Sequence, residues 1–132
     1  MLSQFKNFLE KAGFQIKKED EDKSLLFEFE NLNVIFVCNP SEPDYFRLLL
    51  PRIYSFDKNN KERVCQICDE YNQKFKVAKL WTLDNYIWVA AEQFAYSFDN
   101  IDSLFMRCLR ILDSVYNDLK NTIKENENED GK

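Results

Sequence analysis

Cys65 and Cys68 form the C-x-x-C motif that most nearly resembles a reactive centre in this sequence. A redox motif of this kind places its first thiol at a helix N-terminus, where the surroundings lower the thiol pKa. Here the pair falls inside an expected helix, with Cys68 on the apolar stripe of that helix. We therefore expect two small buried or half-buried thiols, and thiol-redox chemistry is the alternative function.

The cysteines could form a zinc site only if Cys38 and Cys108 converged on the Cys65–Cys68 pair, because the sequence contains no histidine. The absence of histidine also removes the Ser-His and Cys-His nucleophile pairs and the usual general base near neutral pH. We expect neither a metal nor a cofactor.

Glu28, Glu30 and Glu92 are the carboxylates that could supply a pair for acid–base catalysis. Glu28 and Glu30 fall on one face of an expected strand, which is also the ordinary pattern of a solvated or ion-paired surface. No Gly-rich phosphate loop and no serine nucleophile elbow is present in the sequence. A protein without enzymatic activity is therefore expected.

A hairpin is expected from segments 77–83 and 86–94, joined by the two-residue turn Asp84-Asn85. In this register Trp81 is opposite Trp88. One face of the hairpin then combines large aromatic side chains with charged ones, namely Lys79, Trp81, Tyr86, Trp88 and Glu92. Tyrosine, tryptophan and a few charges on one surface are typical of binding hot spots. We predict that this face is a dimer or partner-binding surface.

The sequence leaves three alternatives open for this aromatic face. It could lie under the second helix as ordinary core. It could make only a dimer, with the true site in the loop at 39–44. It could also bind a small molecule, which would place the protein in a different functional class.

Hydrophobic periodicity predicts helices at 3–12, 61–74 and 101–123. Further strands are expected before the second helix, around 14–16 and at 25–30, 34–38 and 45–54. The segment 34–38 is continuously apolar, which predicts a strand covered on both faces. Pro51 predicts an edge or a bulge near the end of the strand at 45–54.

These elements predict an α+β fold, with an antiparallel β-sheet packed with three helices in the order α-β-β-β(-β)-α-β-β-α. An acidic turn is expected at 19–22. We expect a single domain at 1–123, followed by a disordered acidic tail at 124–132.

The composition of this chain of 132 residues argues against two classes of partner. The formal net charge is −5 and the sequence pI about 4.8, whereas nucleic-acid and anionic-membrane partners select basic surfaces. No apolar run approaches the roughly 20 residues that a membrane span needs. We expect no nucleic-acid or membrane partner and a cytoplasmic location.

The second half of the chain also shows a familiar succession of elements. A helix containing Glu70-Tyr71-Asn72 is followed by a lysine-bearing strand at 77–80, a hairpin leading to 89–92, and a long closing helix. This order resembles the type III secretion chaperone-like fold, in particular the YbjN-type bacterial family. The resemblance implies a homodimer that binds other proteins and is not a catalyst. The expected function is a non-catalytic protein-binding module, either chaperone-like or a regulatory adaptor.

Overall fold

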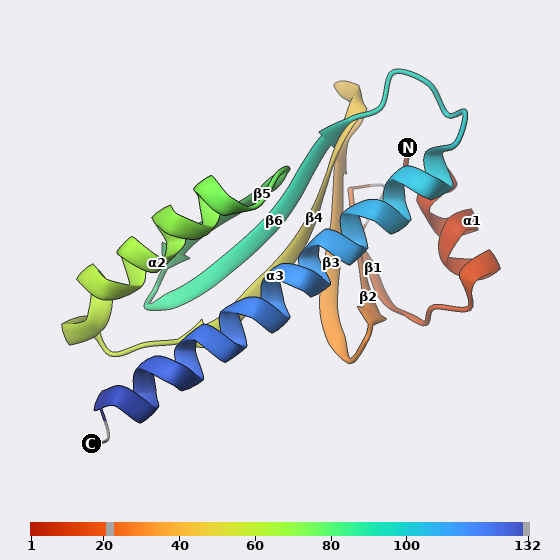
Figure 1. Ribbon diagram of the computed structural model, residues 1–132. Helices are drawn as coiled ribbons and strands as arrows, with labels where there is room; N and C mark the ends of the chain where they lie inside the picture. The colour runs from red at the N-terminus through yellow and green to blue at the C-terminus, as the bar shows by residue number, and fades with distance from the viewer. Residues whose placement is uncertain (21–22, 131–132) are drawn as a thin grey trace.

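The computed structural model describes residues 1–20 and 23–130, with 126–130 described by their backbone alone. Its elements follow one another as α1 (Leu2–Ala12), β1 (Ile16–Asp20), β2 (Ser24–Phe29), β3 (Leu32–Asn39), β4 (Glu42–Ser55), a 3-10 turn η1 (Lys58–Asn60), α2 (Lys61–Lys74), β5 (Ala78–Leu83), β6 (Tyr86–Phe94) and α3 (Ile101–Asp130) (Figure 1). The six strands form one antiparallel sheet in the order β1-β2-β3-β4-β6-β5. The predicted fold class and element order are confirmed.

Local sequence explains where several of these elements end. Gly13 ends α1 with a φ of 80°, a left-handed conformation that glycine adopts without steric cost. Asp84 and Asn85 both have positive φ, 53° and 64°, as a two-residue hairpin turn requires. The hairpin therefore has the predicted register, in which Trp81 is paired with Trp88.

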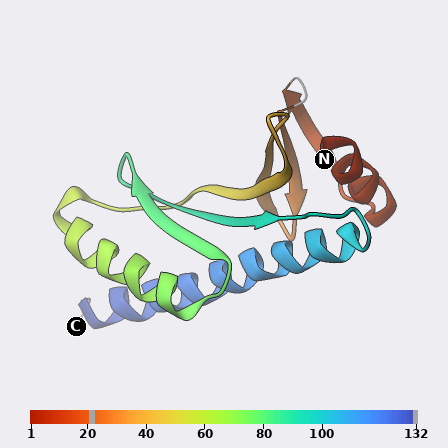
Figure 2. The ribbon, with the colours of Figure 1, turned by 90° about the horizontal axis from the view of Figure 1, so that it is seen from above.

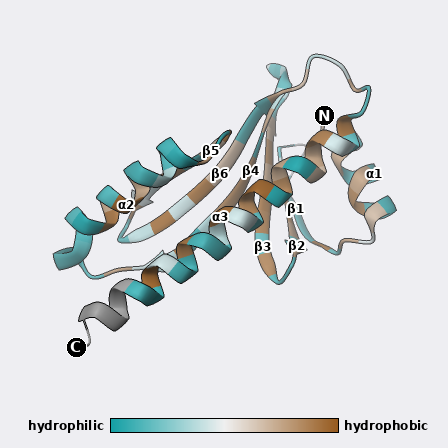
Figure 3. Cartoon of the chain, viewed as in Figure 1, coloured by the Kyte–Doolittle hydropathy of each residue, from teal (hydrophilic) through white to brown (hydrophobic). Residues whose placement is uncertain are grey.

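The three helices cover one face of the sheet, here called the helix face. Its buried side chains alternate along the strands and are aligned across them by the pairing register: Leu25, Phe27, Val34, Phe36, Phe46, Leu48, Leu50, Leu80, Ile87 and Val89. Figure 2 shows α2 and α3 on the same side of β5 and β6. Figure 3 shows polar and apolar residues alternating along α3, as expected for a helix with one buried stripe.

Phenylalanine rings join α1 and α3 to the middle of the sheet. The ring of Phe5 is stacked on that of Phe36, with centroids 4.1 Å apart, and meets Phe105 edge-on at 4.8 Å. Phe105 in turn lies 5.2 Å from Phe46. All of these side chains are fully buried, so the first and last helices share one core with β3 and β4.

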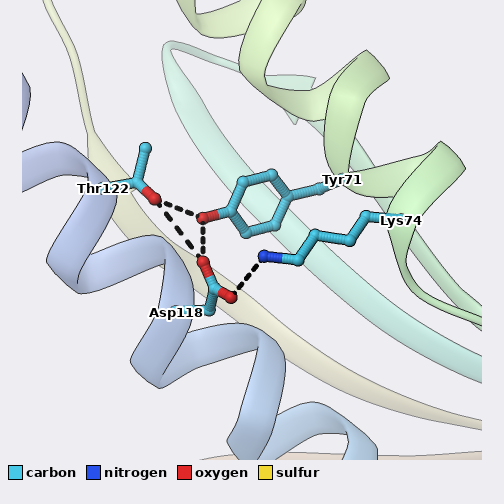
Figure 4. Close-up of polar contacts among 4 residues, drawn as sticks. All are labelled: Tyr71, Lys74, Asp118 and Thr122. Atoms are coloured by element: carbon cyan, nitrogen blue, oxygen red, sulfur yellow. Dashed lines mark hydrogen bonds and ion pairs between the residues drawn. The ribbon is translucent and has the colours of Figure 1, made fainter.

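A polar cluster connects α2 to α3 (Figure 4). The Tyr71 hydroxyl donates to the Asp118 carboxylate at 2.6 Å, and the Lys74 ammonium donates to its other oxygen, also at 2.6 Å. The hydroxyl group of Thr122 lies 2.6 Å from that of Tyr71. Burial and the hydrogen bond to Asp118 raise the pKa of Tyr71 to about 12, whereas Lys74 and Tyr71 lower the pKa of Asp118.

Two expectations for the middle of the sheet are wrong. The strand at 34–38 is not covered on both faces, because only Val34, Phe36 and Cys38 are buried and the side chains between them are half-buried. The loop at 39–44 is instead a tight turn at 40–41, since β3 continues to Asn39 and β4 begins at Glu42. Pro43 is tolerated in β4 because the pairing of β4 with β6 begins only at Tyr45.

The bulge expected at Pro51 is present. The pairing of β4 with β6 shifts between Leu50 and Tyr54, and Arg52 within this interval has a φ of 49°. A bulge leaves residues of the longer strand unpaired, so Pro51 removes no ladder hydrogen bond there.

The last helix is longer than the pattern predicts. It was expected to end at Ile123, but α3 continues to Asp130. Residues 124–130 contain neither glycine nor proline, so no local signal stops the helix before Gly131. Of the predicted tail, 131–132 lie outside the described residues, as do 21–22 of the predicted acidic turn. Within the described part of the chain, no helix is long and apolar enough to span a membrane.

Candidate functional site

The aromatic face of the hairpin points away from the helices. On α2, the Cys65 sulfur lies 4.0 Å from the Thr82 hydroxyl oxygen, so α2 packs against the side of β5 that carries Leu80 and Thr82. Because side chains alternate along a strand, Trp81 lies on the opposite side. The alternative in which the second helix covers the aromatic face is therefore wrong.

Trp81 and Trp88 are stacked across the hairpin. Their ring centroids are 6.3 Å apart with an angle of 19° between the planes, as expected for a directly opposed pair. Both side chains are half-buried. The indole N–H of Trp88 is shielded from solvent and has no hydrogen-bond acceptor within the described part of the chain. The pair thus stabilises the hairpin and still presents aromatic surface to the outside.

Arg47 joins the predicted site from β4, the strand beside β6. It is paired in register with Glu92, and its Nε lies 3.3 Å from a Glu92 carboxylate oxygen. The Lys79 ammonium lies 3.6 Å from that same oxygen, and the Arg47 guanidinium lies 5.8 Å from the Trp81 ring centroid. Sequence reasoning missed Arg47 because only the strand order places it beside Glu92.

Arg52 is the second arginine that the predicted site lacked. Its guanidinium lies over the Tyr86 ring, 5.4 Å from the centroid, within the range of a cation–π contact. The β4 bulge and the positive φ of Arg52 position it there. The proline that marks the bulge was the only signal of this feature in the sequence.

Apolar side chains continue the aromatic surface across the sheet. Leu26 is paired with Ile35, Ile35 with Leu49, and Leu49 with Ala90, so these residues form a row across four strands. The first three are half-buried, and none of the described helices packs on this side. We call this surface the open face; it consists of Leu26, Ile35, Val37, Tyr45, Arg47, Leu49, Arg52, Lys79, Trp81, Tyr86, Trp88, Glu92 and Phe94.

Exposed aromatic rings extend one end of the open face. Tyr45 and Phe94 lie 5.4 Å apart, and Phe94 is stacked on Tyr96 at 6.0 Å. Phe94 is 51% exposed and Tyr96 85% exposed. The alternation that places Trp88 and Glu92 on one face of β6 also places Phe94 there, a signal that sequence reasoning did not use. Burial and a hydrogen bond to Glu92 raise the pKa of Tyr45 to about 12.

The Cys65–Cys68 pair does not have the surroundings of a redox motif. Cys68 is buried, and burial raises its thiol pKa to about 11; burial does the same for Cys108. The thiolate is the reactive form, so these shifts oppose redox chemistry at both residues. Among the described residues, no cluster of three or more His, Cys, Asp or Glu side chains is arranged to hold a metal ion.

The carboxylates considered for acid–base chemistry have separate surroundings. Glu28 forms an ion pair with Lys17 at 3.4 Å, and Glu92 interacts with Arg47 and Lys79. Glu30 is exposed in the turn between β2 and β3. The ion-paired role expected from the strand pattern is therefore observed for Glu28 and Glu92.

A cavity of about 210 Å³ lies between α3 and the end of β4. Its described walls are Ile53, Tyr54, Tyr116, Leu119, Lys120, Ile123 and Lys124. None of the five site residues predicted from the sequence is among them. The small-molecule alternative, which placed its ligand on the aromatic hairpin, gains no support from this cavity.

Comparison with known proteins supports the fold. No protein-family model and no curated protein matches the sequence. Among solved structures, the chain is similar to YbjN from E. coli, a protein proposed to be a transcription regulator, with a TM-score of 0.66 over 92% of each chain. Only 9% of residues are identical, so the resemblance seen in the sequence holds at the level of the fold.

Proposed function

We propose that this chain is a non-catalytic protein-binding module, chaperone-like or a regulatory adaptor, that works as a homodimer and binds protein partners on its open face. One observation carries the proposal. The sheet face opposite the helices presents two stacked indoles and a row of half-exposed apolar side chains. Rigid aromatic surface beside arginines is enriched in protein interfaces.

The chemistry of the chain also favours binding over catalysis. The sequence has no histidine. Both Glu28 and Glu92 are paired with cations, and burial keeps the Cys68 thiol protonated near neutral pH. YbjN, which shares the fold, is proposed to be a transcription regulator. Because this chain is acidic, we attribute a regulatory role of this kind to contacts with proteins.

Affinity capture from the lysate of the native host tests the proposal. The tagged wild type would be compared with Trp88→Ala and with Tyr116→Ala, which removes a half-buried aromatic ring from α3 on the other side of the sheet. Bound proteins would be identified by mass spectrometry. The proposal expects a near-stoichiometric partner that the wild type and Tyr116→Ala retain and Trp88→Ala loses.

Two results would count against it. A partner that Trp88→Ala retains would locate binding away from the open face. If the wild type captures only itself, the protein-adaptor function loses its support and small-molecule screening becomes the next step. Sedimentation equilibrium of the purified protein tests the homodimer separately, because a mass equal to one chain at all concentrations excludes it.

A further inference from the structure

The open face has a charge opposite to that of the whole chain. Around the indoles it carries three cations, Arg47, Arg52 and Lys79, against the single carboxylate Glu92, a local surplus of two positive charges. Glu28, which lies on the same side of β2 as Leu26, is ion-paired with Lys17, and Glu42 interacts electrostatically with Tyr45 near the start of β4. The complete chain has a formal net charge of −5. This part of the open face therefore carries a small positive surplus in a chain that is acidic as a whole.

These cations are incompletely neutralised within the chain. Glu92 is shared by Arg47, Lys79 and the Tyr45 hydroxyl. The exposed Arg52 guanidinium has no ion-pair partner among the described residues. Arginine presents several N–H donors in a planar fork that matches a carboxylate. Arg52 can therefore bind a carboxylate of a partner without breaking an existing ion pair.

Two buried hydrogen-bond donors lie on the open face, the Trp88 Nε1–H and the Arg47 Nε–H. The Trp88 N–H has no acceptor among the described residues, whereas the Arg47 Nε is ion-paired with Glu92 at 3.3 Å without a well-aligned hydrogen bond. A buried donor without an acceptor costs free energy. A partner rich in acceptor oxygens would complement this face better than one rich in amines.

The geometry also shows how a partner would contact this part of the sheet. β5 is the outer strand of the hairpin, but the side-chain amide of Asn72 already bonds to the N–H and the C=O of Leu80 along its free edge. Addition of a further strand at this position is therefore blocked. Contacts must be made by side chains across the face.

We infer that the open face binds a protein segment in which acidic residues stand beside aromatic or aliphatic ones. The carboxylates would be held by Arg52, Arg47 and Lys79, and the apolar side chains would lie on the two indoles. This inference rests on the proposed function and specifies the partner's chemistry. Stacked aromatic rings with arginines also occur in proteins that bind single-stranded RNA, but the net charge of −5 disfavours a polyanion with a phosphate on every residue.

Fluorescence anisotropy with synthetic peptides tests this inference on the full chain. One labelled peptide repeats Asp-Phe-Asp-Leu, a second repeats Lys-Phe-Lys-Leu, a third repeats Ser-Phe-Ser-Leu, and the fourth probe is single-stranded polyuridine. We expect the acidic peptide to bind at least about tenfold more tightly than the basic one, and its affinity to fall as salt is added.

The double variant Arg52→Glu/Lys79→Glu should weaken binding of the acidic peptide by about tenfold or more, since both changes reverse exposed charges. Lys120→Glu reverses an equally exposed charge on α3 and should leave binding unchanged. Circular dichroism would show that each variant is folded.

Each contrary result has a distinct meaning. If the neutral and acidic peptides bind equally and Trp88→Ala abolishes both, the proposed function stands and the acidic preference is wrong. Tighter binding of polyuridine than of any peptide would overturn both. Absence of binding by the acidic peptide at millimolar concentration would overturn the inference, while affinity capture would still decide the proposed function.

Discussion

The side-chain amide of Asn72 in α2 satisfies both backbone polar groups of Leu80 in β5. The Leu80 N–H donates to Asn72 Oδ1 at 2.7 Å, and Asn72 Nδ2 donates to the Leu80 carbonyl at 3.0 Å. These are the two bonds that a neighbouring strand would make. Because β5 is an outer strand, Asn72 protects an edge that would otherwise be open to pairing with another chain.

Replacing this amide should destabilise the protein and expose the edge. We expect Asn72→Ala to lower the free energy of unfolding by about 1–2 kcal/mol, because two hydrogen bonds to a buried residue are lost. Urea denaturation measures this change, and light scattering during prolonged incubation measures aggregation. Gln73→Ala is the matched control, since Gln73 is exposed and its side chain hydrogen-bonds to Asp69 on the same helix. Equal stability of the two variants would contradict the edge-protecting role.

The Tyr71 hydroxyl links α2 to α3, so its removal should weaken the contact between them. Tyr71→Phe keeps the buried ring but removes the hydrogen bonds to Asp118 and Thr122. We expect a loss of about 1–2 kcal/mol in the free energy of unfolding, typical of a hydrogen bond to a charged group. Chemical denaturation checks the value. Tyr116→Phe is the control, since it removes a tyrosine hydroxyl from α3. A similar loss in the free energy of unfolding for this control would refute the explanation.

Asp118 should make stability depend on acid pH. Lys74 and Tyr71 lower its pKa below the ordinary value of 3.8 in the folded protein. A lowered pKa contributes stability that is complete above 3.8 and is lost as the pH falls through the folded value. Wild type should therefore lose more stability than Asp118→Asn as the pH is reduced below about 4. Denaturant midpoints measured across this range test the difference. Parallel curves for the two proteins would show that Asp118 makes no such contribution.

The cysteines should differ in reactivity according to burial. Cys65 is exposed, whereas Cys68 and Cys108 are buried with thiol pKa values of about 11. We expect a thiol reagent at neutral pH to modify Cys65 rapidly, and the other two at a rate limited by opening of the structure. Mass spectrometry of peptides from a time course identifies the modified sites. Rapid modification of Cys68 would revive the thiol-redox alternative.

The Cys65–Cys68 motif can also be tested by its effect on partner binding. The double variant Cys65→Ser/Cys68→Ser should retain the partner recovered by affinity capture, because neither thiol lies on the open face. Loss of the partner from a folded double variant would favour the thiol alternative over the proposed function.

Much of the fold was determined by short-range patterns in the sequence. The strand expected at 25–30, the Asp84-Asn85 turn and the end of the first helix at residue 12 each depend on local backbone geometry, and the structure contains each of them. The register of Trp81 with Trp88 followed from the turn alone, because a two-residue turn leaves no freedom in the pairing.

The sequence alone could not decide which side of the hairpin the helices cover. Both faces carry apolar side chains, and only the packing of α2 against Leu80 and Thr82 leaves Trp81 and Trp88 uncovered. Arg47 and Arg52 were missed for a related reason. Their positions depend on β4 lying next to β6, a pairing between strands far apart in the chain, and on a bulge that repositions the strand. Local propensity determined the elements of this protein, and long-range packing decided which of its surfaces is available for binding.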